Sequence, residues 1–275
     1  MNYLEYIRKY SGRIGVERQN PFTIEEIYGQ KMRELKAIGN SRFHKRVSEL
    51  SGVPMTRDFV RNSFSVDTYD GFVTSMLWGG LGMSNWRQLV NAMATDPSDI
   101  ESKISNLQSL LDEDMIQNAF MSLQVSRDNH YLPTNKIEGI DISYFTKLLY
   151  FLYKGTSATP PIIFDKWGTY IHVGILISQN EIDLLNAYYK MGYDKRGKLY
   201  VAIKTNRTTG YRYSVYADYL QRMANLSSQY SLPNPGMLEE FLFGKDLKHR
   251  VNKSDENPRF FVLNYVREYY DSLTR

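Results

Sequence analysis

Asp165 is the residue of this sequence best suited to catalysis, because it follows the apolar run Ile162-Ile163-Phe164 and precedes Lys166 and Trp167. A carboxylate among hydrophobic residues is costly to bury unless it caps a helix, pairs with a cation or takes part in a reaction. In a reaction, it can stabilise developing positive charge or activate a water molecule. Asp165 can also be the N-cap of a helix that begins at Lys166, and the two roles are compatible.

A polar turn and an apolar helix precede this aspartate. Gly139 lies in the turn, and residues 142–153 are predicted to form a helix that carries Ser143 and Lys147 on one face, one turn apart. The first backbone N–H groups of such a helix have no partner within it, and they suit a phosphate group. Pro160 and Pro161 then stop the chain before the apolar run.

Closely spaced glycines follow Trp78 at Gly79, Gly80 and Gly82. Glycines let a backbone turn sharply or approach another chain, so a ligand could come close here. Alternatively, the segment is a helix end followed by a tight turn, with Trp78 filling the core. The sequence leaves both interpretations open.

The stretch from Lys195 to Arg212 is the most polarised in the chain, because it holds cations and tyrosines but no acidic residue. Cations can neutralise phosphates while tyrosine rings stack on bases. The alternative is a solvated loop whose aromatic residues anchor it to the core. The cations are Lys195, Arg196, Lys198, Lys204, Arg207 and Arg212.

Helical patterns must position these residues. Thr23 with Glu26 forms a capping-box pattern ahead of a helix predicted to run to about residue 50, and Ser98 with Glu101 forms another ahead of a helix through residue 111. No repeat or linker divides the chain, so we expect a single module. Other predicted helices span about 58–64, 69–78, 113–125, 142–153, 180–190, 214–228, 236–243 and 258–273, and one short strand spans 199–204.

Composition excludes several kinds of chemistry. The 275 residues include no cysteine, which removes thiol nucleophiles, disulfides and cysteine-ligated metals. The four histidines are scattered and form no metal-ligand motif. Neither a phosphate-binding glycine loop nor a Gly-x-Ser-x-Gly elbow occurs. Because these motifs are missing, we expect no cofactor. No apolar run has the length of a signal peptide core or a membrane span, so we expect a cytoplasmic protein.

The order of these features resembles the helix-hairpin-helix DNA glycosylases, especially the bacterial group with the 8-oxoguanine-DNA-glycosylase fold. The resemblance rests on the turn, the helix with Phe145-Thr146-Lys147-Leu148-Leu149-Tyr150-Phe151, the prolines, the apolar run and Asp165. In broad order it covers about residues 70–245: Leu77-Trp78-Gly79 resembles the helix end beside the base pocket, and residues 216–220 and 239–243 resemble the C-terminal helices.

Two positions depart from the pattern of that family. The usual two-glycine hairpin keeps only Gly139, and Asp141 stands in the place of the second glycine. Ser143 stands where bifunctional members carry a Schiff-base lysine, and Lys147 lies one turn farther along the helix. Lys147 can reach the pocket from there, or it can hold DNA or pair with a carboxylate.

The resemblance implies a mainly α-helical fold of two lobes, residues 1–65 plus 165–275 and residues 66–164, with Asp165 at the wall of a cleft between them. Asp165 would stabilise an oxocarbenium-like state and orient or deprotonate the attacking water. Lys147 is the second catalytic candidate. The expected base pocket consists of Trp78, Gly79, Gly82, Trp86 and Trp167. The expected DNA-binding residues are Gly139, Asp141, Ser143 and the six cations of the basic stretch.

The implied function is a monofunctional DNA glycosylase. It would act on double-stranded DNA that contains a damaged or modified base, leave an abasic site and need no obligate protein partner. The family implies oxidised guanine as the base; a bulky modified pyrimidine, removed in defence against phage, is the other candidate. The alternative is a noncatalytic DNA-binding or toxin-like interaction protein that keeps the fold. Asp165 favours the enzyme, and the incomplete hairpin favours the alternative.

Overall fold

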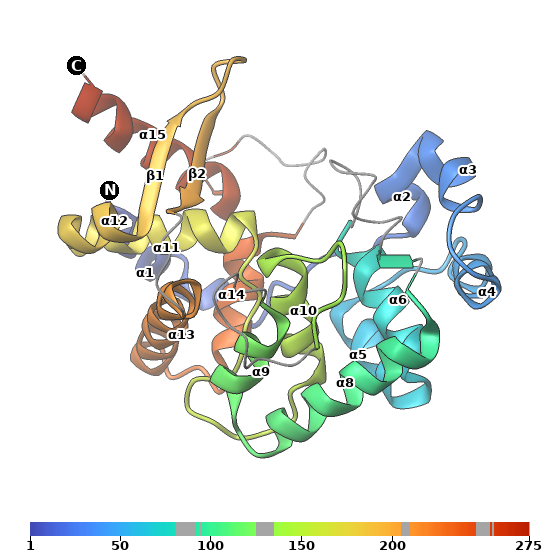
Figure 1. The fold of residues 1–275 in the computed structure, drawn as a ribbon. Coiled ribbons are helices and arrows are strands. Elements are labelled where there is room, and N and C mark those ends of the chain that lie inside the picture. Colours follow the sequence, from blue (N-terminus) through green and yellow to red (C-terminus); the bar gives the residue numbers. More distant parts are fainter. Residues whose placement is uncertain are drawn as a thin grey trace. The chain divides into compact units, whose positions relative to one another are not determined.

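The computed structural model describes residues 1–80, 92–93, 95–124, 135–204, 210–245, 254 and 256–274, and Figure 1 shows their fold. This part of the chain is mainly helical, as the sequence predicts, with one small antiparallel sheet. It forms two compact units: unit 1 comprises Met1–Gln19 and Ile163–Arg275, and unit 2 comprises Asn20–Ile162. Among the described residues, no helix has the length and apolar character that a membrane crossing requires.

Unit 2 is built around α6, which is buried along most of its length from Tyr69 to Trp78. α5 approaches it closely at Gly71, where a side chain would collide with the ring and backbone of Phe64. α10 packs against α5, α6, α8 and α9. In the described residues, the helices of unit 2 are α2 (Ile24–Tyr28), η2 (Gly29–Lys31), α3 (Met32–Leu35), α4 (Ser41–Glu49), α5 (Arg57–Val66), α6 (Thr68–Trp78), α8 (Pro97–Asp112), α9 (Ile116–Leu123) and α10 (Ile142–Leu152).

An ion cluster fastens α4 to α6 and α8. The Arg42 guanidinium lies 2.5 Å from an Asp67 oxygen and 2.7 Å from a Glu101 oxygen. It also lies over the ring of Tyr69, 4.9 Å from the ring centroid. One cation therefore satisfies two carboxylates at the edge of the unit 2 core.

The predicted helix from Thr23 to about residue 50 is wrong as a single element. Thr23 does cap α2, with the reciprocal hydrogen bonds of a capping box to Glu26. The chain then breaks at Gly29 and Gly39, whose φ angles are +51° and +82°, and α4 begins anew after the N-cap Asn40. A residue with positive φ cannot continue a right-handed helix, so the helix must end at each of these glycines. The spacing of apolar residues does not report the φ angle of a single glycine, and it therefore did not reveal these breaks.

The cap of α8 also lies elsewhere than predicted. Asp96 is the N-cap and accepts a hydrogen bond from the Ser98 backbone N–H at 2.9 Å, while Pro97 begins the helix. Ser98 is therefore inside the first turn. Proline is favoured at this first helical position because its missing N–H needs no partner there.

Unit 1 has α11 at its centre. Gly174 lets two neighbours approach this helix, because a side chain there would meet Tyr3 of α1 at 2.9 Å and Val262 of α15 at 3.0 Å. The elements of unit 1 are α1 (Tyr3–Lys9), η1 (Ser11–Arg13), α11 (Lys166–Ser178), α12 (Ile182–Tyr188), β1 (Tyr189–Tyr193), β2 (Leu199–Ile203), α13 (Tyr211–Gln229), α14 (Pro235–Phe243) and α15 (Pro258–Thr274).

A polar network that is buried at His172 and Tyr189 and partly exposed at its other residues joins α11, α12, α13 and β1. His172 is completely buried, with one ring nitrogen 2.7 Å from the Tyr189 hydroxyl and the other 2.8 Å from an Asp218 oxygen. Arg222 donates to Asp218 at 2.8 Å and forms a two-point contact with Glu181 at 2.7 and 2.9 Å. Buried polar groups stabilise a fold only when they are paired, as these are.

The β1–β2 ribbon, drawn in yellow and orange in Figure 1, is the sheet of unit 1. Tyr189 pairs with Ile203 at its base, and Tyr193 pairs with Leu199 near its turn. One face contacts the helices: the Tyr170 hydroxyl donates to the Leu199 carbonyl at 2.8 Å, and the ring of Tyr193 packs edge-on against Tyr270. The predicted strand at 199–204 is β2.

Candidate active site

Asp165 is the N-cap of α11. Its Oδ1 atom accepts hydrogen bonds from the backbone N–H groups of Trp167, at 2.8 Å, and Gly168, at 3.4 Å. The side chain is partly exposed, whereas residues 162–164 before it are buried. The positive end of a helix dipole favours negative charge at this position. The fold therefore holds an ionisable carboxylate in a fixed orientation at a partly exposed point.

Gly168 lets the apolar run pack tightly beneath this carboxylate. A side chain at Gly168 would stand 3.0 Å from Phe164 and 3.2 Å from the Ile163 carbonyl oxygen. The Tyr219 hydroxyl lies 3.6 Å from the same point and is buried without a hydrogen-bond partner among the described residues. Burial raises the pKa of the Tyr219 phenol well above its usual value, and negative charge on Glu239 and Asp165 adds to the rise. Tyr219 therefore remains a neutral group behind Asp165.

Trp167, a base-pocket candidate, lies against cations in unit 1. The Arg259 guanidinium is 5.3 Å from the centroid of its ring, and the Lys166 ammonium is 5.7 Å away. Arg259 is itself buried and lies 4.0 Å from the Phe243 ring centroid. These contacts fix the indole at the start of α11, next to Asp165.

Lys147 of α10 is buried, with only 4% of its surface exposed. Its Nζ atom donates to the Ser143 carbonyl oxygen at 2.8 Å and lies 5.3 Å from the Tyr144 ring centroid. Long side chains on a helix point back toward its N-terminus, and here the ammonium returns to the level of Ser143. The structure thus brings Lys147 to the helix turn where bifunctional glycosylases were expected to carry their lysine.

Gly79 and Trp78 belong to the same part of unit 2. A side chain at Gly79 would stand 3.0 Å from Cδ and 3.2 Å from Cε of Lys147, so the glycine makes room for the lysine stem. The Trp78 ring packs edge-on against Phe151 with 5.3 Å between centroids. Trp78 is thus a core residue of unit 2, and its Nε1–H has no acceptor among the described residues. Gly82 and Trp86 lie outside the described residues.

Gly139, Asp141 and Ser143, the residues expected at the hairpin, lie at the N-terminus of α10. Gly139 has a φ angle of +84°, which fits the turn expected there. Asp141 is the N-cap of α10 and accepts a hydrogen bond from the Ile142 N–H at 2.8 Å. Ser143 follows in the first turn, partly exposed. A carboxylate therefore already supplies the negative charge at the helix end where we expected a phosphate.

The basic stretch is divided between the ribbon and α13. Lys195, Arg196 and Lys198 are exposed in the turn between β1 and β2, and Lys204 is exposed directly after β2. The Asp194 carboxylate organises the turn by accepting from the backbone N–H groups of residues 196 and 198. Arg212 is exposed in the first turn of α13. Arg207 lies outside the described residues.

A comparison with models of known protein families shows to which family the chain belongs. A family model described as "Putative 8-oxoguanine DNA glycosylase OGG-like protein" matches residues 53–243, more than half of the chain. The chain belongs to this OGG-like family. Membership indicates a DNA glycosylase-type function with DNA as the substrate. Neither a curated protein nor a solved structure matches the chain.

The region matched to the OGG-like family includes all the predicted site residues. It begins at Val53, ahead of α5, and ends at Phe243, the last residue of α14. Asp165 belongs to unit 1 and Lys147 to unit 2, and the match spans both. Helices α1 to α4 and α15 lie outside it, so Arg259, the partner of Trp167, is not part of the matched region.

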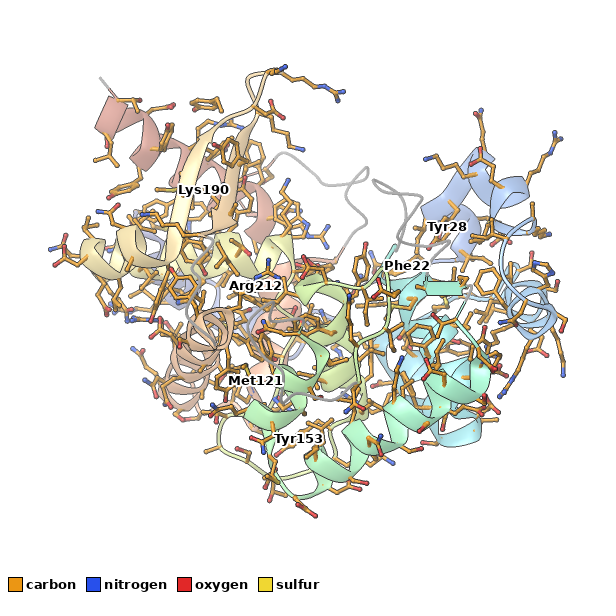
Figure 2. The ribbon with its side chains drawn as sticks, viewed as in Figure 1. Phe22, Tyr28, Met121, Tyr153, Lys190 and Arg212 are labelled. Atoms are coloured by element: carbon orange, nitrogen blue, oxygen red, sulfur yellow. The ribbon has the colours of Figure 1, made fainter. Side chains whose placement is uncertain are left out.

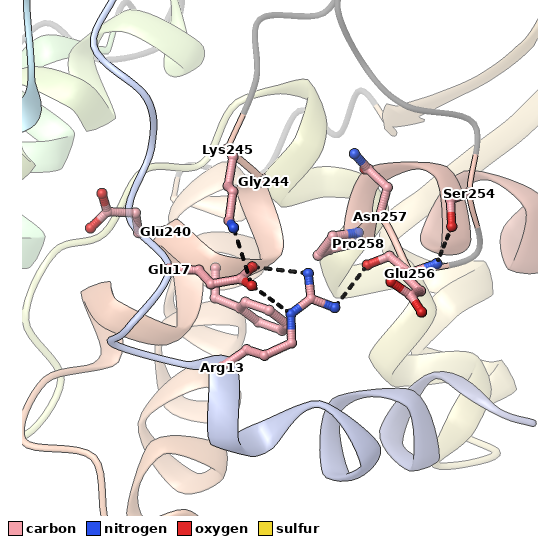
Figure 3. A pocket seen from close by; sticks show the side chains of 10 residues that line it. Arg13, Glu17, Glu240, Gly244, Lys245, Ser254, Glu256, Asn257 and Pro258 are labelled. Carbon is pink, nitrogen blue, oxygen red and sulfur yellow. Dashed lines mark hydrogen bonds and ion pairs between the residues drawn. The ribbon is translucent and has the colours of Figure 1, made fainter.

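A cavity of about 160 Å³ lies within unit 1 of this OGG-like protein (Figure 3). Three of the charged groups that line it, Arg13, Glu17 and Lys245, are paired with one another. Arg13 donates to both carboxylate oxygens of Glu17, at 2.8 and 2.9 Å, and Lys245 lies 3.2 Å from Glu17. Arg13 also donates to the Glu256 carbonyl oxygen at 3.2 Å. We assign this cavity no part in the reaction. Among the described residues, no group of three side chains is placed to bind a metal ion.

Two residues that lie beside the candidates were not predicted: Lys190, which pairs with Ala202 in the basic stretch, and Arg259, which contacts Trp167. Lys190 lies on β1, within a segment predicted to be helical; the alternation of Tyr189, Met191 and Tyr193 was the signal for a strand. Arg259 contacts Trp167 from far along the chain, and no local pattern predicts such a contact.

Proposed function

We propose that this chain hydrolyses the N-glycosidic bond between a damaged or modified base and its deoxyribose, with Asp165 as the catalytic carboxylate. The observation that carries the proposal is the partly exposed Asp165 carboxylate, held by two backbone N–H groups at the start of α11. Its position within the region matched to the glycosylase family supports this assignment.

The chemistry requires a negative charge close to the sugar. As the bond from C1′ to the base lengthens, positive charge spreads over C1′ and the ring oxygen, and a nearby carboxylate stabilises it. Water adds to C1′ and loses a proton to Asp165, while the base leaves with the bonding electron pair and takes up a proton from solvent. The products are a free base and an abasic site in an intact strand. The target base must first leave the stack, and we propose that Trp167, next to Asp165 at the start of α11, receives it.

We assign Lys147 an electrostatic role in a monofunctional enzyme. Its Nζ atom donates to the Ser143 carbonyl and lies over the Tyr144 ring, and these contacts direct the side chain back along its own helix. Ser143, at the expected nucleophile position, has a hydroxyl and cannot form an imine.

The experiment measures base release from defined DNA. Duplexes with a single 8-oxoguanine and genomic DNA from phages with bulky modified pyrimidines are incubated with the protein, and the released base is identified by mass spectrometry. Release from either substrate names the base, and release from phage DNA alone supports a role in phage defence. Asp165→Asn should reduce release by orders of magnitude while DNA binding persists, because the amide keeps the shape and removes the charge.

Asp96→Asn is the matched control, because Asp96 is also an aspartate at a helix N-cap but lies outside the proposed site. It should release base at the wild-type rate. DNA binding without release from any substrate would favour the noncatalytic DNA-binding protein instead.

The cytoplasmic location expected from the sequence stays a prediction.

A further inference from the structure

The solvent-facing side of the β1–β2 ribbon carries a row of cations around one tyrosine. Side chains alternate between the faces of a strand, so Lys198, Tyr200 and Lys204 share one side of β2 and its extensions. Lys190 pairs directly with Ala202 and therefore lies on the same side. All four of these side chains are exposed. We call this set, Lys190, Lys198, Tyr200 and Lys204, the outer ribbon face; Figure 2 labels Lys190 on it.

Charge on the ribbon is far from the average of the molecule. The whole chain carries a formal net charge of +4. Residues 189–204 alone contain Lys190, Lys195, Arg196, Lys198 and Lys204, with Asp194 as the single acidic residue. The Asp194 carboxylate is engaged with backbone N–H groups of the turn, which lower its pKa. The cations of the ribbon are thus exposed to solvent with little negative charge in the same segment.

Tyr200 lies across Gly192 at the centre of the face. A side chain at Gly192 would stand 2.8 Å from the Tyr200 hydroxyl and 3.0 Å from its Cζ, so the ring occupies the space that glycine leaves. Glycine in a strand often marks such a close approach. Tyr200 remains 41% exposed. An aromatic surface between cations suits a nucleic acid, where rings pack on sugars and bases while ammonium groups meet phosphates.

We infer that the outer ribbon face binds the DNA duplex along its backbone, through Lys190, Lys198 and Lys204 and the ring of Tyr200. Six residues of strand span about 20 Å, so Lys198 and Lys204 can reach phosphates about six nucleotides apart, at about 3.4 Å of axis per nucleotide. A two-stranded ribbon also fits the major groove of B-DNA. Lys204 donates to the Asn186 carbonyl, and its remaining N–H groups can meet a phosphate.

This inference rests on the DNA-substrate part of the proposed function and not on catalysis. It assigns the DNA contact to the outer ribbon face. Lys198 and Lys204 belong to that face, whereas Lys195 and Arg196 belong to the turn. It adds Lys190, which the sequence alone did not indicate, and it selects Tyr200 among the tyrosines of the basic stretch.

The experiment measures binding of the full chain to a fluorescent unmodified duplex by anisotropy over a series of salt concentrations. The triple variant Lys190→Ala, Lys198→Ala, Lys204→Ala should bind more weakly, and its plot of log affinity against log salt should flatten by about 0.9 for each phosphate that the protein no longer neutralises. The control triple Lys9→Ala, Lys36→Ala, Lys45→Ala removes the same charge from exposed positions elsewhere and should keep the wild-type slope. Equal effects of the two triples, or no effect of either, would overturn the inference.

Tyr200 gives an independent readout. Tyr200→Ala should weaken binding about fivefold or more without changing the salt slope, because ring packing releases no counterions, whereas Tyr200→Phe should bind like the wild type. Thermal unfolding of each variant checks that the ribbon still folds. Wild-type protein that binds through the ribbon but releases no base would sink the glycosylase proposal alone. Base release by wild-type protein, with an unchanged slope in the ribbon triple, would sink the ribbon inference alone.

Discussion

Asp165 has a structural role that can be measured apart from chemistry, because its side chain satisfies two backbone N–H groups of α11. Removing an N-cap side chain typically costs about 1 kcal/mol. We therefore expect Asp165→Ala to lower the free energy of unfolding by about 1 kcal/mol, measured by urea titration, while Asp165→Asn and Asp165→Ser stay closer to wild type. All three variants should lose base release. A fully stable Asp165→Ala protein would contradict the cap described here.

Lys147 provides the test of monofunctional chemistry. Because its ammonium is held by the Ser143 carbonyl and the Tyr144 ring, we expect borohydride to trap no covalent protein–DNA adduct, and strands to break at the product only after alkali. Gel electrophoresis of treated and untreated reactions measures both. The control is Lys147→Met, which keeps an aliphatic stem against Gly79. Efficient trapping by the wild type that disappears in Lys147→Met would make the enzyme bifunctional.

The sequence predicts the local structure around the candidate residues better than their tertiary contacts. A cap at Asp165 follows from an aspartate between an apolar run and a helix, and the shared face of Ser143 and Lys147 follows from helical spacing. The contact of Lys147 with Gly79 joins α10 to the end of α6, and that of Trp167 with Arg259 joins α11 to α15. Such contacts depend on tertiary packing, and local sequence contains no period or cap that encodes them.

At the scale of elements, several apolar helices were predicted within a few residues. The expected segments 69–78, 142–153 and 236–243 correspond to α6, α10 and α14. Errors arose where a local backbone conformation decides the structure: positive φ at Gly29 and Gly39 divides the first predicted long helix. Residues 189–190 were placed in a helix because β1 follows α12 with no intervening loop.

Gly39 offers a test of this explanation. A side chain there would adopt an unfavourable φ of +82° and stand 2.6 Å from the Phe43 ring. We expect Gly39→Ala to lower the free energy of unfolding by about 1–3 kcal/mol, from strain and crowding together. Gly12→Ala is the control, because Gly12 has no positive φ and open space around its Cβ position. Equal stability of the two variants in urea titrations would show that the break between α3 and α4 does not depend on Gly39.

At the scale of the molecule, unit 1 concentrates groups whose charges depend on the fold. Burial lowers the pKa of the His172 imidazole below its usual value. Burial alone would raise the pKa of Asp218, but hydrogen bonds from His172 and Arg222 outweigh it and lower that pKa. A hydrogen bond from Arg222 lowers the pKa of Glu181. All three shifts make the folded state release protons more readily than the unfolded chain.

Unit 2 contains opposing shifts. Burial and the neighbouring Asp67 raise the pKa of Asp70, so its protonation on acidification favours the folded state. Hydrogen bonds from Ser51 and the Gly52 N–H outweigh burial at Glu25 and lower its pKa, which has the reverse effect. These two contributions oppose each other within unit 2, whereas those of the His172 network add up within unit 1. Acid should therefore affect the two units differently.

We predict that unit 1 loses stability first as the pH falls. Above about pH 6.5, His172 is neutral in both the folded and unfolded states and favours neither. Below that pH, the unfolded chain takes up a proton that folded His172 resists, so the free energy of unfolding falls by at most about 1.4 kcal/mol per pH unit. The stabilisation from Asp218 and Glu181 is present above their unfolded pKa values of about 4 and is lost only below them.

Hydrogen–deuterium exchange between pH 7.5 and 5.5, corrected for intrinsic exchange rates, measures this difference. In that window His172 should act alone in the network, so amides of α11 and α13 should lose protection while those of α6 and α10 change less. His172→Gln keeps a group that can hydrogen-bond to Asp218 but does not titrate, and it should abolish the pH dependence of unit 1 even if the variant is less stable overall. The same loss of protection in both units, or a pH dependence that survives in His172→Gln, would show that the network of His172 is not what makes unit 1 sensitive to acid.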